Sequence, residues 1–440
     1  MESRIKTIYH DLVSGKRSCF DMVQEKLTLL SANAYHTANL LLEESALTQA
    51  KKIDEKIRSG KSLGLLEGVP FGIKDVLLLQ NTLSTGSSDF LKNYNAPYTA
   101  TAIQKLMDAG AIPVVKENCS NGGSAVNVAK GYTAFSIGTD TGSCIRQPAG
   151  NNKMYGLKPT YGSISRYGMM ANMSSTDCIG PLAAYLEDIR ILFNMMSGKD
   201  PNDPATRNSS TIPENVFDPD YLKKEIIIGY YKNFIDSDCL EDAVKNDFHK
   251  MLDVLSAKGL KIIPLDFFDI RLSVSVFYVL AMAEEASNHA RFDGSLYGAR
   301  GKSSSREGYM QTRADNFSKE TISRIVGGNL ALSRGNYEEI YLKARKLRKA
   351  MEDRFNAGIK EVDVILSPVS RGFSTSPAFG SSPDSPLAIY LSDAFTAVFS
   401  LGGLPTLTVP FFTPAGIQIT SNKNQEDVIL NFAHALNEIQ

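Results

Sequence analysis

Two short loops in the middle of the chain carry residues that could perform nucleophilic chemistry. The first is Ser120-Asn121-Gly122-Gly123-Ser124-Ala125, and the second is Gly138-Thr139-Asp140-Thr141-Gly142-Ser143-Cys144-Ile145-Arg146-Gln147-Pro148. Glycines let the chain turn sharply and point successive backbone N–H groups at one place, as an oxyanion-binding loop requires. A glycine-rich loop is also often only a turn. The hydroxyl and thiol side chains beside these glycines favour a site.

A lysine closes an apolar segment earlier in the chain. The sequence Gly68-Val69-Pro70-Phe71-Gly72-Ile73-Lys74-Asp75 reads as a short buried strand that ends on Lys74. In the ordinary case such a lysine extends its ammonium group into solvent and has a structural role only. If Lys74 stays buried, its amine becomes a candidate proton acceptor.

The elements that must position these residues alternate between helix and strand. A helix is expected from Thr99, with Gly110 as its stop, and a strand at Ile112–Val115 that ends on Lys116. A short helix of small residues follows at Gly122–Lys130, and then a buried strand at Phe135–Ile137. The alternation predicts an α/β fold.

The rest of the chain continues in the same manner. Helices are expected at Phe20–Leu30 behind a Ser18 cap, Ala46–Ile57, Leu240–Leu255 and Tyr337–Phe355, and a further helix beginning at Ile179–Leu182 and running from Glu187 to about Met196. Strands are expected at Ile226–Gly229, Leu260–Leu265 and Val362–Pro368. The polar, basic segment Arg300–Arg313 is expected to be a solvated loop.

Composition limits the possible classes of protein. The chain has 440 residues, of which 43% are hydrophobic and 22% charged, and this suits a globular protein with a large core. The net charge of −1 and the lack of a basic run argue against a large nucleic-acid surface, so any RNA is expected to bind a partner. The cysteines are scattered and have no CxxC spacing, which argues against a disulfide framework and a zinc site and favours a reducing compartment: Cys19, Cys119, Cys144, Cys178 and Cys239.

The sequence gives no sign of membrane insertion. No apolar run approaches the roughly 20 residues that span a bilayer, and the start of the chain lacks the apolar core of a secretory signal. The first residues carry Lys and Arg but also Glu2 and Asp11, so a mitochondrial address is neither indicated nor excluded.

These residues together resemble the amidase signature family. Its hallmarks are a lysine that closes a Gly-x-Pro-x-x-x-Lys-Asp strand, a serine in a Gly/Ser-rich loop and a nucleophilic serine in Gly-Thr-Asp-Thr-Gly-Gly-Ser-Ile-Arg. Gly68–Asp75 matches the first, and Ser120 falls on the second. The family's nucleophile position lies 24 residues later (144 − 120 = 24), on Cys144. The resemblance implies one α/β domain over 1–440 with a twisted mixed β-sheet covered by helices on both faces: an N-terminal helical part (1–62), a signature core (63–200) and a C-terminal part that completes the sheet (201–440).

The resemblance is most specific for the branch that forms the A-type component of glutamyl-tRNA(Gln) amidotransferases. It rests on matches from about Phe20 to Gln418, which include Gly156–Gly162 and the segment from Phe317 to Tyr337. In that branch the residues matching Arg324 and Asp393 hold the α-carboxylate and α-amino groups of glutamine. A guanidinium for a carboxylate and a carboxylate for an ammonium is the charge pairing that a free amino acid requires.

The family implies a mechanism for this site. A nucleophile attacks the side-chain amide of glutamine, Ser120 relays its proton, and Lys74 acts as the base, which requires a pKa lowered from about 10.4 toward 7 or 8. Backbone N–H groups of Thr141, Gly142, Ser143 and Cys144 are expected to bind the oxyanion. Because this chain has Gly142-Ser143-Cys144 where the family has Gly-Gly-Ser, the nucleophile is Cys144, Ser143 from a shifted loop, or absent, and we rank Cys144 first.

A second departure is a missing segment. The family has roughly thirty more residues between the strand at Val114-Val115 and the Ser120 loop. That segment helps to line the family's pocket, so this protein either has a barer site or completes the site in a different way.

Three functions follow from the resemblance. The first is a glutaminase component that supplies ammonia to glutamate carried on tRNA, with a tRNA-binding kinase/transamidase partner of the B type and a small third component. No cofactor or metal is expected in this chain, and ATP and Mg²⁺ are expected in the partner. The second is a catalytically impaired scaffold, and the third is a free-standing amidase for another small amide. Similarity to organellar, fungal-type versions implies a mitochondrial location, with a cytoplasmic one as the alternative.

Overall fold

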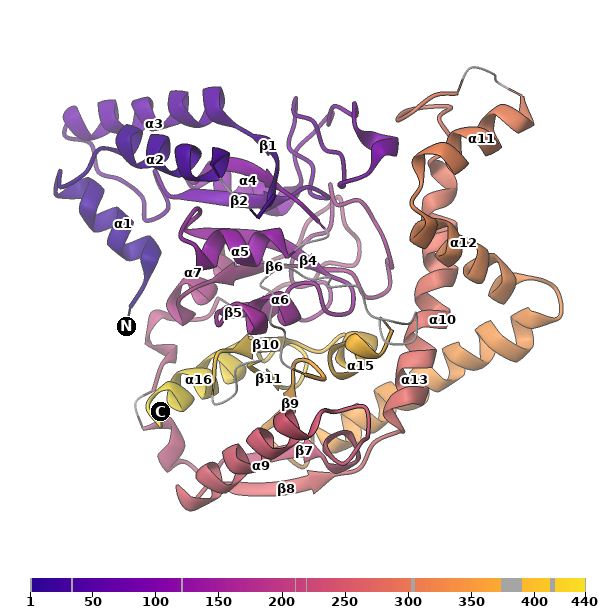
Figure 1. Cartoon of the computed structure of the whole chain (residues 1–440). Coiled ribbons are helices and arrows are strands. Elements are labelled where there is room, and N and C mark those ends of the chain that lie inside the picture. The colour runs from indigo at the N-terminus through magenta and orange to yellow at the C-terminus, as the bar shows by residue number, and fades with distance from the viewer. Residues whose placement is uncertain are drawn as a thin grey trace.

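A single β-sheet runs through the molecule (Figure 1). The structure is a computed structural model and describes residues 2–32, 35–119, 122–209, 211–218, 220–301, 305–372, 390–411 and 416–439. The described strands form one eleven-stranded sheet in the order β1-β3-β2-β4-β6-β5-β10-β11-β9-β7-β8. Their bounds are β1 Ala38–Leu41, β2 Pro70–Lys74, β3 Ile112–Glu117, β4 Phe135–Asp140, β5 Tyr155–Lys158, β6 Cys178–Ala183, β7 Ile227–Tyr231, β8 Lys261–Leu265, β9 Val364–Pro368, β10 Thr406–Val409 and β11 Ile417–Thr420.

The sheet is mixed. Strands β3, β2 and β4 are parallel, as are β9, β7 and β8. The pairs from β4 through β6, β5, β10 and β11 to β9 are antiparallel. The carboxyl ends of parallel neighbours meet at the same edge of a sheet, so β2 and β4 deliver the residues that follow them to one place.

Helices surround the sheet. Their bounds are α1 Arg4–Val13, α2 Cys19–Ser31, α3 Glu43–Arg58, α4 Thr101–Asp108, α5 Gly123–Ala129, α6 Arg146–Asn151, α7 Leu186–Met196, α8 Lys232–Ile235, α9 Asp242–Ala257, α10 Ile270–Asn288, α11 Arg306–Asn316, α12 Lys319–Leu332, α13 Lys343–Gly358, α15 Ala394–Leu401 and α16 Glu426–Asn437, with short helical turns at η1 Asp89–Leu91, η2 Glu214–Val216, η3 Tyr221–Lys223, η4 His289–Arg291 and η5 Tyr337–Leu342. Helices α11 and α12 follow the long helix α10 at one side of the molecule (Figure 1).

Side-chain alternation along β6 shows that both faces of the sheet are covered. Leu182 packs with apolar residues of α5 and α6. Ile179 and Ala183, which point to the opposite face because side chains alternate along a strand, belong to the main core together with Ile189 of α7. The predicted mixed sheet with helices on both faces is therefore confirmed. None of the helices in the described ranges is long and apolar enough to cross a membrane.

Most of the expected elements are present where the local signals were strong. The Ser18 hydroxyl accepts a hydrogen bond from the Asp21 backbone N–H and caps α2. Gly110 has a φ of 87°, which ends the α4 segment in the left-handed region where glycine has no steric penalty. Helix α5 and strand β3 also confirm the expected short helix and strand.

Two expectations were wrong. Ile179–Leu182 was expected to begin a helix but lies within strand β6, because β4 pairs with it on one side and β5 on the other. Arg300–Arg313 was expected to be a loop, but α11 begins at Arg306, where the Ser305 hydroxyl accepts from the Gly308 N–H and caps the helix. Of that segment, Lys302–Ser304 lies outside the described residues.

Candidate active site

The lysine and the thiol selected from the sequence meet at the carboxyl edge of the sheet. Strand β2 ends on Lys74, its parallel neighbour β4 ends on Asp140, and Cys144 follows in the loop after β4. Lys74 and Cys144 both line a cavity of about 440 Å³. They also share a second, smaller cavity of about 60 Å³ with Ser143. The structure therefore brings together two of the predicted catalytic residues.

The loop that carries Cys144 is held from beneath by a buried ion pair. Asp140 and Arg146 are both fully buried, and the Arg146 guanidinium donates to both carboxylate oxygens, at 2.9 and 3.0 Å. Asp140 Oδ2 also accepts from the Ile145 N–H, and Arg146 Nη2 donates to the Gly142 carbonyl at 2.7 Å. These bonds hold the loop in place, because they satisfy the Gly142 carbonyl and the backbone N–H groups of Ile145 and Arg146.

The remaining N–H groups of this loop bond to no other described residue. Among the hydrogen bonds between described residues, none uses the backbone N–H of any residue in Thr141–Cys144. Thr141 and Cys144 line the larger cavity, and Ser143 and Cys144 line the smaller one. This is the arrangement that an oxyanion hole requires, with unspent donors fixed in advance by the surrounding structure.

The two candidate nucleophiles have different surroundings. The side chain of Cys144 is exposed to the cavity. Ser143 is buried, and its hydroxyl interacts with the Asp393 carboxyl, whose pKa is raised by burial although this interaction opposes the rise. The geometry therefore favours Cys144 over Ser143, because a nucleophile must reach a substrate in the cavity.

Lys74 does not extend into solvent. Its side chain is 8% exposed, and its Nζ donates to the Thr139 carbonyl at 3.3 Å. Burial acts to lower the pKa of Lys74. The negative charges of ionised Cys144 and Cys119, and of Asp140 and Asp177, outweigh burial, so the pKa of Lys74 lies above its usual value. The lowered pKa expected for a base of this family is therefore absent when these neighbouring groups are ionised.

The thiol also keeps its proton in the resting site. Desolvation raises the pKa of Cys144, and the Lys74 ammonium opposes this shift without cancelling it. The two groups are coupled, so the loss of one proton belongs to the pair and not to either residue alone. Loss of the first proton therefore leaves an ammonium beside a thiolate, and each of these charges stabilises the other.

Arg324 and Asp393 are connected by a tyrosine. The Tyr278 hydroxyl donates to Asp393 Oδ2 at 2.6 Å, and the Arg324 guanidinium lies 5.9 Å from the centre of the Tyr278 ring. Both charges influence the pKa of Cys144. Arg324 Nη1 donates to Glu285 Oε1 at 3.0 Å, and Nη2 donates to Glu320 Oε1 at 2.8 Å. A carboxylate ligand of Arg324 would share the guanidinium with these two glutamates.

The predicted relay residue Ser120 lies outside the described residues, as does Asn121. On either side of them, Cys119 and Gly122 line the smaller cavity together with Lys74 and Cys144. The loop that carries Ser120 therefore adjoins the site at both of its described ends.

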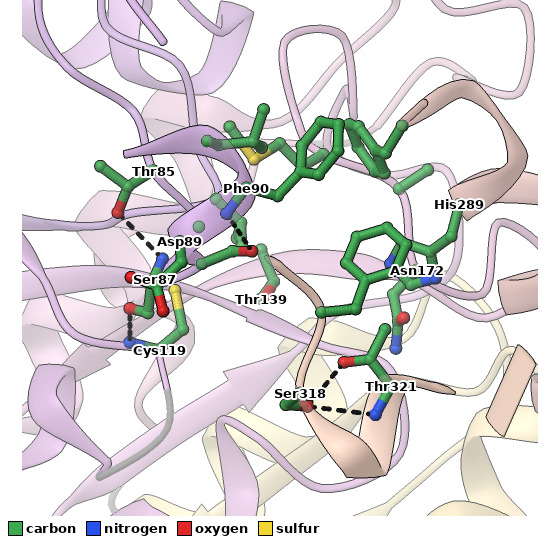
Figure 2. A pocket seen from close by; sticks show the side chains of 18 of the residues that line it. Thr85, Ser87, Asp89, Phe90, Cys119, Thr139, Asn172, His289, Ser318 and Thr321 are labelled. Atoms are coloured by element: carbon green, nitrogen blue, oxygen red, sulfur yellow. Dashed lines mark hydrogen bonds between the residues drawn. The ribbon is translucent and has the colours of Figure 1, made fainter. Parts of the chain in front are cut away.

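The larger cavity continues outward between two parts of the chain (Figure 2). On one side lies the turn Thr85–Leu91, where Ser87 accepts a hydrogen bond from the Cys119 N–H at 2.9 Å. On the other side lie His289 and the start of α12, where the Ser318 hydroxyl caps the helix through the Thr321 N–H. Among the described residues, no group of three or more His, Cys, Asp or Glu side chains is arranged to hold a metal ion.

The sequence analysis missed several residues at this site. Asp177, which accepts from the Thr141 hydroxyl at 2.5 Å, lies before a strand that was expected to be a helix. Tyr278 lies on α10, a helix that was not expected because its apolar residues occupy most of its faces. Glu117, a buried carboxyl beside Lys74, had one available signal: together with Lys116 it forms a charged pair of residues at the end of an apolar strand.

A thiol, a buried lysine and N–H groups that bond to no described residue are the groups that an acyl-transfer site requires. The Amidase family model matches residues 26–121 and 119–430, and the chain belongs to the amidase signature family. The two matched stretches meet at the loop before α5, where the sequence analysis placed the missing segment.

Curated relatives cover nearly the whole chain. The A-type component of the glutamyl-tRNA(Gln) amidotransferase of Nostoc punctiforme is 35% identical over 472 residues, covering 98% of this chain and 96% of the relative. The corresponding A-type component of Koribacter versatilis is 36% identical over 442 residues, covering 92% and 90%.

Solved structures agree in fold. The A-type component of the Thermotoga maritima glutamyl-tRNA(Gln) amidotransferase superposes with a TM-score of 0.73 at 28% identity, covering 96% of this chain and 91% of that one. A protein from a vestigial complex related to the origins of an s-triazine catabolic enzyme has a TM-score of 0.82 at 21% identity, which shows the shared fold alone.

Proposed function

We propose that this chain is the glutaminase component of a glutamyl-tRNA(Gln) amidotransferase, with Cys144 as the nucleophile. The observation that carries the proposal is that Cys144 and Lys74 line the same two cavities, beside Thr141 and Ser143, whose backbone N–H groups bond to no described residue. The near full-length similarity to the A-type components of these enzymes supports glutamine as the substrate and ammonia as the product delivered to a partner.

The reaction balances as an acyl transfer followed by hydrolysis. The Lys74–Cys144 pair first loses one proton to solvent, and Sγ of Cys144 then attacks as the thiolate and forms a bond to the amide carbon of the glutamine side chain. The Lys74 ammonium supplies the proton for the leaving nitrogen, with Ser120 as the proposed relay. The electron pair of the carbonyl moves to the oxygen, which the loop N–H groups stabilise. When that pair returns, the carbon–nitrogen bond breaks and the nitrogen leaves as ammonia with the transferred proton. Water then attacks the thioester, glutamate departs, and the thiol regains its proton.

Arg324 and Asp393 are proposed to bind the amino acid end of glutamine. The guanidinium suits the α-carboxylate. The carboxylate suits the α-ammonium, because Asp393 Oδ1 receives no hydrogen bond within the geometric limits from any described residue. This orientation would direct the side-chain amide toward Cys144, which both charges already influence.

The partner is proposed to be a tRNA-binding kinase/transamidase of the B type, with a small third component in the complex. ATP and Mg²⁺ are assigned to that partner. The net charge of −1 supports placing the tRNA mainly on the partner. We further propose a mitochondrial location, which imaging of the tagged chain in its own cells tests; a cytoplasmic signal would contradict it.

The decisive experiment measures ammonia release from glutamine by the complex of this chain with its partner. We expect release that depends on Cys144 and falls to background in a Lys74→Ala variant. Release no greater than that of the Lys74→Ala variant would replace this proposal with a scaffold role. Full activity of the isolated chain that does not respond to Arg324→Ala would instead identify a free-standing amidase.

A further inference from the structure

A second buried charge lies beside Lys74 and takes no part in the mechanism above. Glu117 is the last residue of β3, and its Cα pairs in register with that of Lys74, the last residue of the parallel strand β2. Register partners on neighbouring strands place their side chains on the same face of a sheet. Glu117 is 0% exposed, so its carboxyl lies inside the protein.

The Glu117 carboxyl fits against β2 because residue 72 is a glycine and has no side chain. An ideal Cβ built on Gly72 would lie 1.9 Å from Glu117 Oε1, so the carboxyl occupies the space that any larger side chain would need. Gly72 and Lys74 are two residues apart on β2 and therefore share a face. The Glu117 carboxyl thus crosses from β3 to β2 on the face that carries Lys74.

Residues of neighbouring elements donate hydrogen bonds to one oxygen of this carboxyl and not to the other. Oε1 accepts from the Ser136 hydroxyl of β4 at 2.7 Å and from Asn127 Nδ2 of α5 at 2.9 Å. Oε2 receives no hydrogen bond within the geometric limits from any described residue, although Ser124 lies close enough to lower the pKa of the carboxyl. Burial raises the pKa of Glu117, and the Lys74 charge acts in the opposite direction. The two groups are therefore linked electrostatically without forming a direct ion pair.

We propose that Glu117 is a positioning residue for Lys74: its carboxylate, fixed over Gly72 by Ser136 and Asn127, keeps the resting ammonium charged and on the cavity face. The inference rests on the proposed function, because it assigns Lys74 and Cys144 as the reacting pair. Glu117 touches no substrate and acts only through Lys74.

Four other groups raise the pKa of Lys74 more than Glu117 does, so the effect of Glu117 adds to theirs. They are Cys144 and Cys119 from the two loops, Asp140 at the end of β4, which Arg146 neutralises, and Asp177 before β6. The adjacent Lys116 and Asp75 form their own pair at 3.3 Å, so their charges largely offset one another. Compared with all of these groups, Glu117 can be neutralised with less disturbance of the loops.

The substitution Glu117→Gln tests the proposal with nearly unchanged shape. The amide oxygen can still accept from Ser136 and Asn127, and the amide nitrogen replaces the oxygen that receives no hydrogen bond. The measurement is the rate at which iodoacetamide alkylates Cys144 in the full-length chain, followed by mass spectrometry of the Cys144 peptide as a function of pH. Alkylation needs no glutamine, so its result is separate from that of the ammonia assay.

Removal of a nearby negative charge makes it easier for the Lys74–Cys144 pair to lose its proton, whichever of the two groups releases it. We expect the pH inflection of the alkylation rate to move down by about one unit, the effect of a unit charge several ångströms away in a protein. On the acid side of the inflection the rate then rises about tenfold. Glu117→Asp, which keeps the charge, should return the inflection toward that of the unmodified chain.

Glu187→Gln is the matched control. Glu187 is also a buried carboxyl, but it pairs with Arg190 and Lys6 at α7, away from Lys74. This control should leave the inflection unchanged. If Glu117→Gln also leaves it unchanged, Glu117 has only a structural role and the proposal is overturned.

A second variant covers the case in which Glu117→Gln does not fold. Ser136→Ala removes one donor to Oε1 and makes the ionised carboxyl less stable. We expect a smaller shift of the inflection in the same direction. No shift, or a shift to higher pH, would contradict the proposal.

Discussion

Replacing Arg324 tests whether this residue recognises the amino acid end of the substrate. A single substitution is ambiguous, because Glu285 is buried and would lose its cationic partner. Breaking a buried pair typically costs about 3–5 kcal/mol of stability, which could hide an effect on binding. The informative variant is therefore the double substitution Arg324→Gln with Glu285→Gln, which removes both charges at once.

The structure sets the size of the expected effect. The Arg324 side chain is 24% exposed, so a bound carboxylate would be only partly screened by water. A hydrogen bond to a charged group contributes about 1.5–3 kcal/mol, and the KM for glutamine should therefore rise by roughly 10- to 150-fold. The kcat should change much less, because Arg324 binds the end of the substrate that does not react.

Steady-state ammonia release measured against glutamine concentration, together with the urea midpoint of each variant, checks this prediction. Glu320→Gln is the control, because it removes only the exposed partner of Arg324 and should change KM less than about threefold. If the double variant retains the KM of the unmodified enzyme and is folded, Arg324 does not bind the α-carboxylate.

Further expectations concern the charges around Cys144. The pKa values of both Cys144 and Lys74 are raised, so the thiolate forms only when the pair loses a proton. The rate at which Cys144 is alkylated should therefore increase with pH through an inflection above the ordinary thiol value of about 8.5. An inflection below that value would contradict the raised pKa of Cys144. Arg146→Met leaves Asp140 buried without its partner and should lower the free energy of unfolding by about 3–5 kcal/mol, which urea denaturation measures, with Arg190→Met at the α7 pair as a comparison. Ser143→Ala should retain ammonia release within about tenfold of the unmodified enzyme, since Ser143 is buried against Asp393, and a complete loss would identify it as the nucleophile.

The elements that the sequence predicted well are those with local signals. The Ser18 cap of α2, the Gly110 end of the α4 segment and the helical spacing of Tyr337–Phe355, now η5 and α13, depend on residues close together in the chain. The errors occurred in segments whose secondary structure is determined by tertiary contacts. Ile179–Leu182 is a strand because β4 and β5 lie on either side of it, and nothing in its own residues reveals those neighbours.

The same distinction holds for the site. Lys74 and Cys144 could be selected because each lies in a segment with a recognisable pattern. Their meeting depends on β2 and β4 being parallel neighbours, which the sequence pattern alone did not establish. The pKa of Lys74 could not be predicted, because it depends on Asp140, Asp177 and Cys119, which approach from three separate segments. Tyr278 was missed because its helix is apolar on most faces and gave no amphipathic signal.

The most direct test of the central claim is to identify the residue that carries the acyl group. The complex is mixed with glutamine, quenched with acid within the first turnover, digested and examined by mass spectrometry; a diazo-ketone analogue of glutamine gives a permanent adduct at the same atom. We predict a γ-glutamyl thioester, and the analogue label, on Cys144 and a loss of both in Lys74→Ala. A label on Ser143, or ammonia release without any acylated residue in this chain, would contradict the account.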